Sequence, residues 1–151
     1  MPYTLALLIT FLLTALLTGL IWTVQLVHYP SFLNVGSDSL SQYESLHRKR
    51  IFPLVGPLMV AELIATGYLT FTQLTNNYHI LAALLLLPIW LHTWFFAAPA
   101  HFLLSKFGYD EKVIRRLVSS NWIRTLAWTI RLTIYFALVY TLMSDYPQGV
   151  T

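Results

Sequence analysis

Four apolar stretches, each about 20 residues long, dominate the chain and leave little choice of fold. They cover residues 5–27, 51–71, 80–100 and 123–143. A helix of about 20 apolar residues crosses the hydrocarbon core of a bilayer, and in lipid only helices and closed barrels satisfy every backbone hydrogen bond. The pattern therefore predicts an all-α protein, a bundle of four transmembrane helices that forms one domain over residues 1–151.

The composition agrees with a membrane protein and excludes several kinds of site. Hydrophobic residues make up 57% of the 151 residues and charged residues only 10%, whereas a soluble domain carries about 25% charged residues. The sequence has no cysteine, which excludes disulfides, thiolate metal ligands and a cysteine nucleophile. The net charge of +3 does not indicate nucleic acid, because the positions of the cations have another explanation.

The cations gather on one side of the predicted membrane. Three lie at positions 48–50, five lie between positions 106 and 124, and the ninth, Arg131, is inside the fourth stretch. The two ends of the chain and the segment between the second and third stretches carry no Lys or Arg. Since segments rich in Lys and Arg stay in the cytoplasm, we expect both basic segments to be cytoplasmic and both termini to lie outside.

Helix signals continue past the apolar stretches on the cytoplasmic side. Asp38 and Ser39 offer an N-cap for a helix that runs into the second stretch, and Asp110 offers one for a helix that runs into the fourth. The second and fourth helices should therefore project into the cytoplasm. Prolines inside the second and third stretches should kink those helices; they are Pro53, Pro57 and Pro88.

Ionisable residues inside the spans are costly, at about 3 kcal/mol for an unpaired charge at mid-span. Glu62 lies twelve residues beyond Arg50, roughly 18 Å along a helix. Arg131 and His92 lie at a shallower depth of roughly 10 Å. We expect Glu62 and Arg131 to pair, either to lock two helices together or to take part in chemistry, and the sequence leaves both roles open.

Polar residues recur on all four helices at the cytoplasmic edge. They are Gln25 and His28 on the first helix, Tyr43 and His47 on the second, His101 on the third, and Asn121, Arg124 and Trp128 on the fourth. Spacings of three and four residues place most of them on one face of each helix. Polar faces on four helices in one leaflet predict a shared interior site.

The residue types allow three kinds of ligand. His28, His47 and His101 could ligate a metal such as iron, copper or zinc, or two of these histidines could hold haem iron axially. Arginine and asparagine side chains could hold an anionic or carbonyl oxygen. Glu44 and His47 fit the string E-x-x-H, but a second copy is missing and we expect Glu44 to lie outside the bilayer.

We divide the remaining candidates by role. The candidate catalytic residues are Glu62, Asn121, Arg124 and Arg131. The candidate cofactor-binding residues are Gln25, Tyr43, His92 and Trp128. His92 and His101 are nine residues apart, about half a turn out of phase on a helix, so they can share a site only if the helix breaks near Pro99. His79 is expected to be a solvated loop residue.

Five segments resemble small four-span bacterial membrane proteins of unassigned function; they are WTVQLVHYPSF, YESLHRKRI, GPLMVAE, PAHFLL and NWIRTLAWTIR. This resemblance extends over residues 22–131. More distantly, NWIRTLAW and the four-span layout are similar to the anthrone oxygenase-like membrane proteins, whose last helix also carries an asparagine, an arginine and a tryptophan. The resemblance implies a bacterial inner (plasma) membrane. It singles out His28, His47, Glu62, His101, Asn121, Arg124 and Trp128.

Two classes of function stay open. The first is a membrane-bound oxidoreductase, oxygenase-like, with a metal, haem or quinone-like ligand in the cytoplasmic leaflet. The second is a non-enzymatic transport, binding or assembly protein whose polar face handles a small molecule or a partner helix. Four spans are few for a transporter, so transport would need a homo-oligomer. In either class the expected surroundings are the lipid bilayer and a small-molecule ligand.

Overall fold

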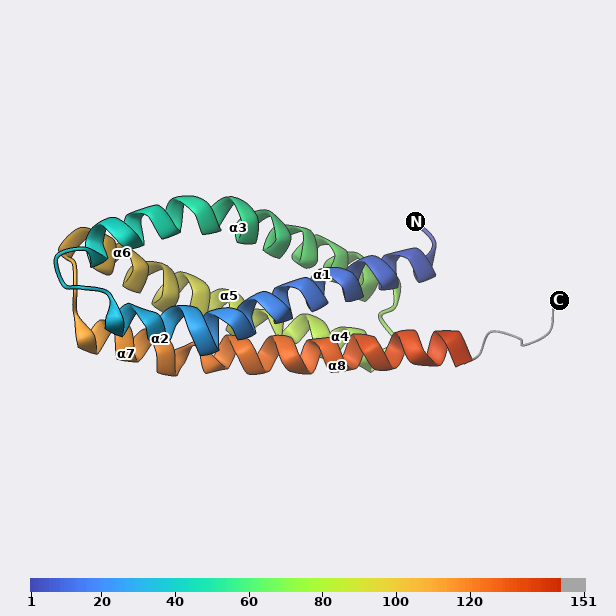
Figure 1. Ribbon diagram of the computed structural model, residues 1–151. Helices are drawn as coiled ribbons and strands as arrows, with labels where there is room; N and C mark the ends of the chain where they lie inside the picture. The colour runs from blue at the N-terminus through green and yellow to red at the C-terminus, as the bar shows by residue number, and fades with distance from the viewer. Residues whose placement is uncertain (145–151) are drawn as a thin grey trace.

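Four long helical rods form the molecule in the computed structural model, which describes residues 1–144 (Figure 1). The rods are Tyr3–Asn34, Leu40–Thr72, Asn77–Phe107 and Glu111–Ser144. Each is long and apolar enough to cross a membrane. The all-α, four-helix architecture predicted from the sequence is therefore confirmed for these residues, and the last part of the predicted domain, 145–151, lies outside them.

Two of the rods are divided by turns of non-α geometry. The first rod consists of α1 (Tyr3–Thr23), the π-helical turn η1 (Val24–His28), the short α2 (Tyr29–Ser31) and the 3-10 turn η2 (Phe32–Asn34). The third consists of α4 (Asn77–Leu84), α5 (Leu86–His92), the π-helical turn η3 (Thr93–Ala97) and α6 (Ala98–Phe107). The second rod is the single helix α3 (Leu40–Thr72), and the fourth is α7 (Glu111–Ser120) followed by α8 (Trp122–Ser144).

The rods run antiparallel, so the N-terminus and the end of α8 lie at the same end of the bundle (Figure 1). The opposite end, which we call the basic end, holds the turns 35–39 and 108–110 and the cations of 48–50 and 106–116. Helix α1 packs against α3 and α8, and α5 packs against α8. Large apolar side chains point outward around the bundle, such as Ile64, Phe95 and Phe136, as lipid contact requires.

All four rods are longer than a bilayer core. They contain 31 to 34 residues, which is roughly 50 Å of helix against about 30 Å of hydrocarbon. The predicted extension of the second and fourth helices agrees with these lengths, and the first and third rods also exceed the thickness of the hydrocarbon core. The Asp110 side chain caps α7 as predicted, accepting the backbone N–H groups of Lys112 and Val113. Ser39 occupies the N-cap position of α3 but makes no side-chain capping bond.

Both π-helical turns come just before a proline, Pro30 in the first rod and Pro99 in the third. The residue before each proline donates its N–H to a carbonyl five residues back: Tyr29 to Val24, and Ala98 to Thr93. A proline ring clashes with the carbonyl four residues back in a regular helix, and a widened turn relieves that clash. The break expected near Pro99 therefore takes the form of a π-helical turn, a feature that often marks functional sites.

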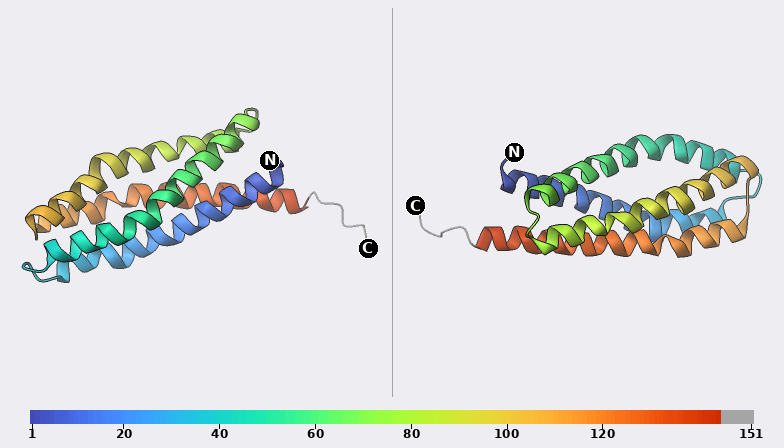
Figure 2. Two further views of the ribbon diagram at one scale, coloured as in Figure 1. Left: turned by 90° about the horizontal axis from the view of Figure 1, so that it is seen from above. Right: turned by 180° about the vertical axis from the view of Figure 1, so that it is seen from behind.

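The prolines of α3 bend the helix without breaking it. Helix α3 runs unbroken through Pro53 and Pro57, and it arches away from the third rod in its middle (Figures 1 and 2). It contacts α6 towards the basic end and α4 towards the other end. In the third rod the α-helix is interrupted at Leu85, three residues before Pro88.

Candidate functional site

The buried ion pair between Glu62 and Arg131 is the centre of the first polar network. Glu62 Oε1 lies 3.1 Å from Arg131 Nη2, and the two side chains are 1% and 0% exposed. Thr14 donates its hydroxyl to Glu62 Oε1 at 2.8 Å, and Trp128 Nε1 donates to Oε2 at 3.1 Å. Both carboxylate oxygens are thus hydrogen-bonded, which a buried charge requires.

Arg131 extends the central network to all four rods. Its Nη2 donates to the Thr66 hydroxyl at 2.9 Å, its Nη1 donates to the backbone carbonyl of Ala82, and its guanidinium lies 5.6 Å from the centre of the Tyr135 ring. Glu62 and Arg131 do not line the large cavity that lies between α3 and the third rod. Their placement therefore accounts for a lock between the helices and adds no support for the catalytic roles predicted from the sequence.

A second polar network lies nearer the basic end and forms a continuous chain. Glu44 Oε1 lies 2.5 Å from His101 Nδ1, and His101 Nε2 lies 2.9 Å from the Tyr29 hydroxyl. Arg124 Nη2 donates to the same hydroxyl oxygen at 3.1 Å. If His101 Nδ1–H donates to Glu44, the Tyr29 O–H is left to donate to Nε2, and each group in the chain has a partner of the right kind.

Arg124 is held in place by side chains for which the sequence predicted catalytic or cofactor-binding roles. Asn121 Oδ1 accepts from Arg124 Nε at 2.9 Å and also from Nη2. Asn121 in turn donates to Gln25 Oε1 at 2.8 Å, and Gln25 donates to the Val118 carbonyl at 3.1 Å. Gln25 and Asn121 are almost fully buried and do not line the cavity. They therefore position the Arg124 side chain and do not contact a ligand. Arg124 Nη1 donates to the Thr93 hydroxyl, in the π-helical turn η3, at 3.3 Å.

Three side chains at the basic end meet as potential metal ligands. One donor atom each from Glu44, His47 and His101 lies within 4.8 Å of the other two. His28 is outside this group, although its ring lies 4.1 Å from that of His47. Two buried atoms here, Glu44 Oε2 and His28 Nε2, have no hydrogen-bond partner within residues 1–144. Such atoms are rare in native structures, and one explanation for them is an ion or a water.

The arrangement of His28 and His47 does not suit haem. Two axial imidazoles must approach the iron from opposite faces of the porphyrin. The rings of His28 and His47 instead lie against each other, with centres 4.1 Å apart and planes inclined by 35°. A macrocycle cannot fit between them in this arrangement.

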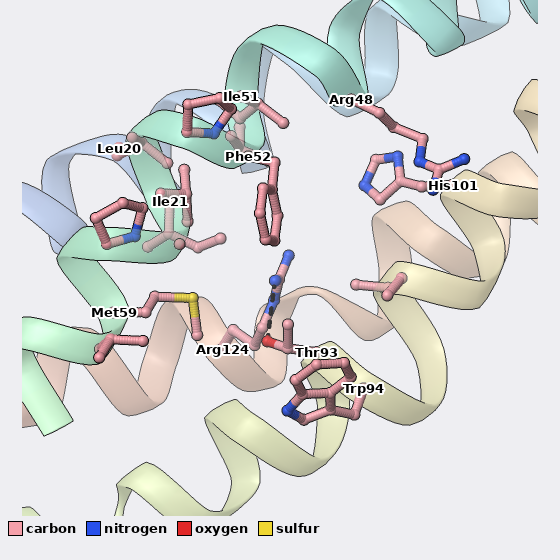
Figure 3. Close-up of a pocket in the computed structure, with 18 of the residues that line it drawn as sticks. Leu20, Ile21, Arg48, Ile51, Phe52, Met59, Thr93, Trp94, His101 and Arg124 are labelled. Carbon is pink, nitrogen blue, oxygen red and sulfur yellow. Dashed lines mark hydrogen bonds between the residues drawn. The ribbon is translucent and has the colours of Figure 1, made fainter.

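A cavity of about 1190 Å³ adjoins this cluster. It lies where α3 arches away from the third rod, and residues of α1 and α8 line it as well. Its wall is mostly apolar, with Tyr29, Thr93, His47 and His101 among its polar residues. Figure 3 shows the Arg124 side chain reaching into the cavity, hydrogen-bonded to Thr93. The volume is somewhat larger than the usual range for small-molecule sites, about 300–1,000 Å³.

The structure brings some of the predicted residues to the cavity and leaves others apart. Four of them line it: His47, His101, Arg124 and Trp128. Tyr43 does not line it; this residue is 39% exposed, and its ring centre lies 6.3 Å from that of His28.

Two histidines lie where the sequence did not place them. His92 is buried but does not line the cavity; it stacks on Phe96, and neither of its nitrogens has a partner among the described residues. The expectation of a solvated His79 is wrong, because its side chain is fully buried and lies 3.2 Å from the Tyr3 hydroxyl.

Glu44, Tyr29 and Thr93 are site residues that the sequence reading missed. Glu44 was set aside as lying outside the bilayer, yet it is fully buried because α6 packs against α3. The E-x-x-H string with His47 was the available signal. Tyr29 lies one helical turn after Gln25, so it was visible as part of a polar face but received no role. Thr93 carried no signal, since a lone threonine in an apolar helix usually bonds its own backbone.

Comparisons with protein-family models, with curated proteins and with solved structures found no match for this chain. The resemblance to the anthrone oxygenase-like proteins therefore stays a prediction from the sequence.

Proposed function

We propose that this membrane protein binds a divalent transition-metal ion through Glu44, His47 and His101 and acts as an oxidoreductase on an apolar small molecule held in the adjoining cavity. The observation that carries the proposal is the meeting of three donor atoms within 4.8 Å. These donors come from two different rods, α3 and α6. His47 and His101 also line the cavity, so a metal held there would adjoin the bound molecule.

The donor set favours particular metals. Two imidazoles and one carboxylate form the ligand set of non-haem iron(II) oxygenases, in which open coordination positions remain for oxygen and substrate. The same set binds catalytic zinc in some hydrolases. Iron is the better fit to redox chemistry, because zinc has no redox activity. The metal would supply the redox chemistry, and the chain would supply binding, orientation and proton handling.

Metal binding would require a small local rearrangement. Glu44 Oε1 and His101 Nδ1 are 2.5 Å apart, whereas both would lie about 2.0–2.2 Å from a shared metal ion. The two side chains must therefore separate slightly and lose their direct hydrogen bond. His101 Nε2 would keep its contact with the Tyr29 hydroxyl but would now be the donor, because a metal on Nδ1 leaves the ring proton on Nε2. A partner on the second ring nitrogen is the usual way in which a metal-bound histidine is oriented.

Tyr29 is the group best placed to move a proton. Its hydroxyl contacts both His101 and Arg124, and the residue lines the cavity. Donation from Arg124 stabilises negative charge on the phenol oxygen. Tyr29 can therefore hand a proton to a ligand in the cavity, and Arg124 would stabilise the phenolate that remains.

Metal analysis of the protein purified in detergent tests the proposal. The wild type and Glu111→Gln, an exposed carboxylate near the same end, should each hold one iron or zinc ion per chain. Glu44→Gln and His47→Gln should lose the ion while the protein keeps its helical circular dichroism. A wild-type protein that is folded, yet binds neither iron(II) nor zinc when they are supplied, would refute the metal site.

One observation favours a second function, non-enzymatic binding or transport of the same apolar ligand. Glu44, His101, Tyr29 and Arg124 contact one another in succession, and the mostly apolar wall of the adjoining cavity can hold an apolar molecule by itself. Ligand binding that is unchanged by chelators, in a protein that never acquires a metal, would support this function instead.

A further inference from the structure

Arg124 is a buried cation without a carboxylate partner. Arg124 is only 6% exposed. Within residues 1–144, the ion pairs are His101 with Glu44, Arg115 with Glu111, and Arg131 with Glu62. Arg124 contacts only neutral groups, namely Asn121, Thr93 and Tyr29. Buried charges are normally paired, so an anion is missing from the immediate surroundings of Arg124.

The wall of the cavity has one sign of charge. Its formally charged residues are all cationic: Arg48, Lys49 and Arg124. No aspartate or glutamate of the described chain lines it. A concave, mostly apolar surface with cations alone concentrates anions by focusing the field. This charge distribution is independent of the hydrogen bonding of Arg124, and it leads to the same class of ligand.

The free hydrogen-bonding capacity of Arg124 is small. A guanidinium has five N–H donors, and four are engaged by Asn121, Thr93 and Tyr29. One N–H on Nη1 is left without a partner in the described residues. That donor suits a single oxygen of a small oxyanion such as a carboxylate. A phosphate monoester has three strong acceptor oxygens, and most of them would stay unpaired at this one donor.

The cavity is open to the lipid-facing surface. Several apolar residues that line it are also exposed on the outside of the bundle; they are Phe52, Val60, Ile64 and Trp94. They belong to α3 and to η3, the two elements between which the cavity lies. An apolar molecule dissolved in the bilayer could therefore enter sideways, without passing through water.

We infer that the cavity binds a lipid-soluble monocarboxylate, with its carboxylate at Arg124 and its apolar body among the side chains of α3 and η3. The inference deepens the proposed function by naming the class of ligand. It depends on the cavity and on Arg124, and does not depend on the metal. Occupation would place the carboxylate near the Tyr29 hydroxyl, which shares Arg124 as its partner.

Binding of cis-parinaric acid, a fluorescent polyene fatty acid, tests the inference on chelator-treated wild-type protein in nanodiscs of neutral lipid. Tryptophans 90, 94 and 128 line the cavity, so they should transfer excitation energy to the bound polyene. Oleate should displace it, whereas oleyl alcohol, of the same chain length without the charge, should compete at least about tenfold more weakly, as expected for loss of a charge-assisted hydrogen bond.

Matched variants locate the site of binding. Arg124→Gln should weaken the binding of parinarate about tenfold or more and leave that of oleyl alcohol unchanged. Arg116→Gln, which removes the same charge outside the cavity, should bind as the wild type does. Equal competition by oleate and oleyl alcohol on the wild type would overturn the inference even if Arg124→Gln fails to fold. Displacement by phosphatidylglycerol but not by oleate would overturn it in favour of a phospholipid site.

Using metal-free protein separates this inference from the proposed function. Carboxylate binding without any metal uptake would support the cavity assignment and refute the metal site. Metal uptake with no preference for oleate over oleyl alcohol would support the metal site and refute the carboxylate site at Arg124.

Discussion

The hydroxyl of Tyr29 lies 2.9 Å from Nε2 of His101 and joins the first rod to the third beside the cavity. Because His101 also contacts Glu44 and Tyr29 also contacts Arg124, this one bond connects a buried carboxylate to a buried guanidinium. We therefore expect the four residues to be energetically coupled, so that a substitution at one of them changes the contacts of the others.

Tyr29→Phe should reveal that coupling. The variant leaves His101 Nε2 and one Arg124 N–H without a partner, which should cost about 1–3 kcal/mol of unfolding free energy. Loss of an outer partner of a metal-bound histidine should also lower metal affinity about 10- to 100-fold. Thermal unfolding and metal titration measure the two effects. Tyr140→Phe removes the hydroxyl of an exposed tyrosine and should change neither. Unaltered metal affinity in Tyr29→Phe would show that the chain does not orient His101.

Glu62 and Arg131 should be energetically coupled. Glu62→Gln or Arg131→Met alone leaves a buried charge unpaired, so each should destabilise the protein by about 3–5 kcal/mol. The double variant should recover part of that loss, with a coupling energy of about 0.5–3 kcal/mol. Unfolding in detergent mixtures gives the four values of the cycle. Strictly additive losses would contradict the pairing.

Thr14→Val should weaken the same network from the first rod. Its hydroxyl donates to Glu62 Oε1 at 2.8 Å, and the valine would leave that oxygen with Arg131 as its remaining partner. We expect a loss of about 1–3 kcal/mol, as for other buried hydrogen bonds to a charged group. Thr133→Val, which removes an exposed hydroxyl bonded only to the Thr129 carbonyl, is the control and should be close to neutral. Equal stability of Thr14→Val and Thr133→Val would mean that Thr14 adds nothing to the network.

Both termini should lie outside the cytoplasm. The expectation rests on the confinement of Lys and Arg to two segments, which the fold gathers at the basic end. Alkaline phosphatase, which is active only outside the cytoplasm, should be active when fused to the C-terminus, and a cytoplasmic reporter at the same position should be silent. The opposite pair of results would invert the bundle and place the cavity in the other leaflet.

The helices and the central ion pair could be predicted because their signals are strong and nearly local. Apolar length alone specifies a membrane helix, and the cost of an unpaired charge in lipid identifies Glu62 and Arg131 as partners. The side-by-side packing of the rods cannot be predicted from any one segment, because it depends on contacts between segments. The burial of Glu44 and His79 could not be predicted for this reason, since the packing of neighbouring rods buries residues that hydropathy assigns to the membrane edge or to a loop.

The composition of the histidine cluster depended on details of helix phase. His92 and His101 are on one rod, and the intervening π-helical turn changes the phase between them, which spacing rules for a regular helix do not anticipate. His28 lies at the end of such a turn as well. Its ring reaches His47, while its donor atoms stay outside the group formed by Glu44, His47 and His101. Sequence spacing could identify the candidate histidines, but it could not predict which of their donor atoms come together.

X-ray absorption at the metal edge tests the central claim most directly, because it reports the ligands of the ion and not only its presence. The purified protein loaded with iron(II) should show nitrogen and oxygen ligands at about 2.0–2.2 Å, with outer scattering from two imidazoles. His47→Gln should reduce that scattering to one imidazole, and His92→Gln should leave it unchanged. A spectrum of iron in water, or one that is identical in the wild type and His47→Gln, would contradict a metal site built from Glu44, His47 and His101.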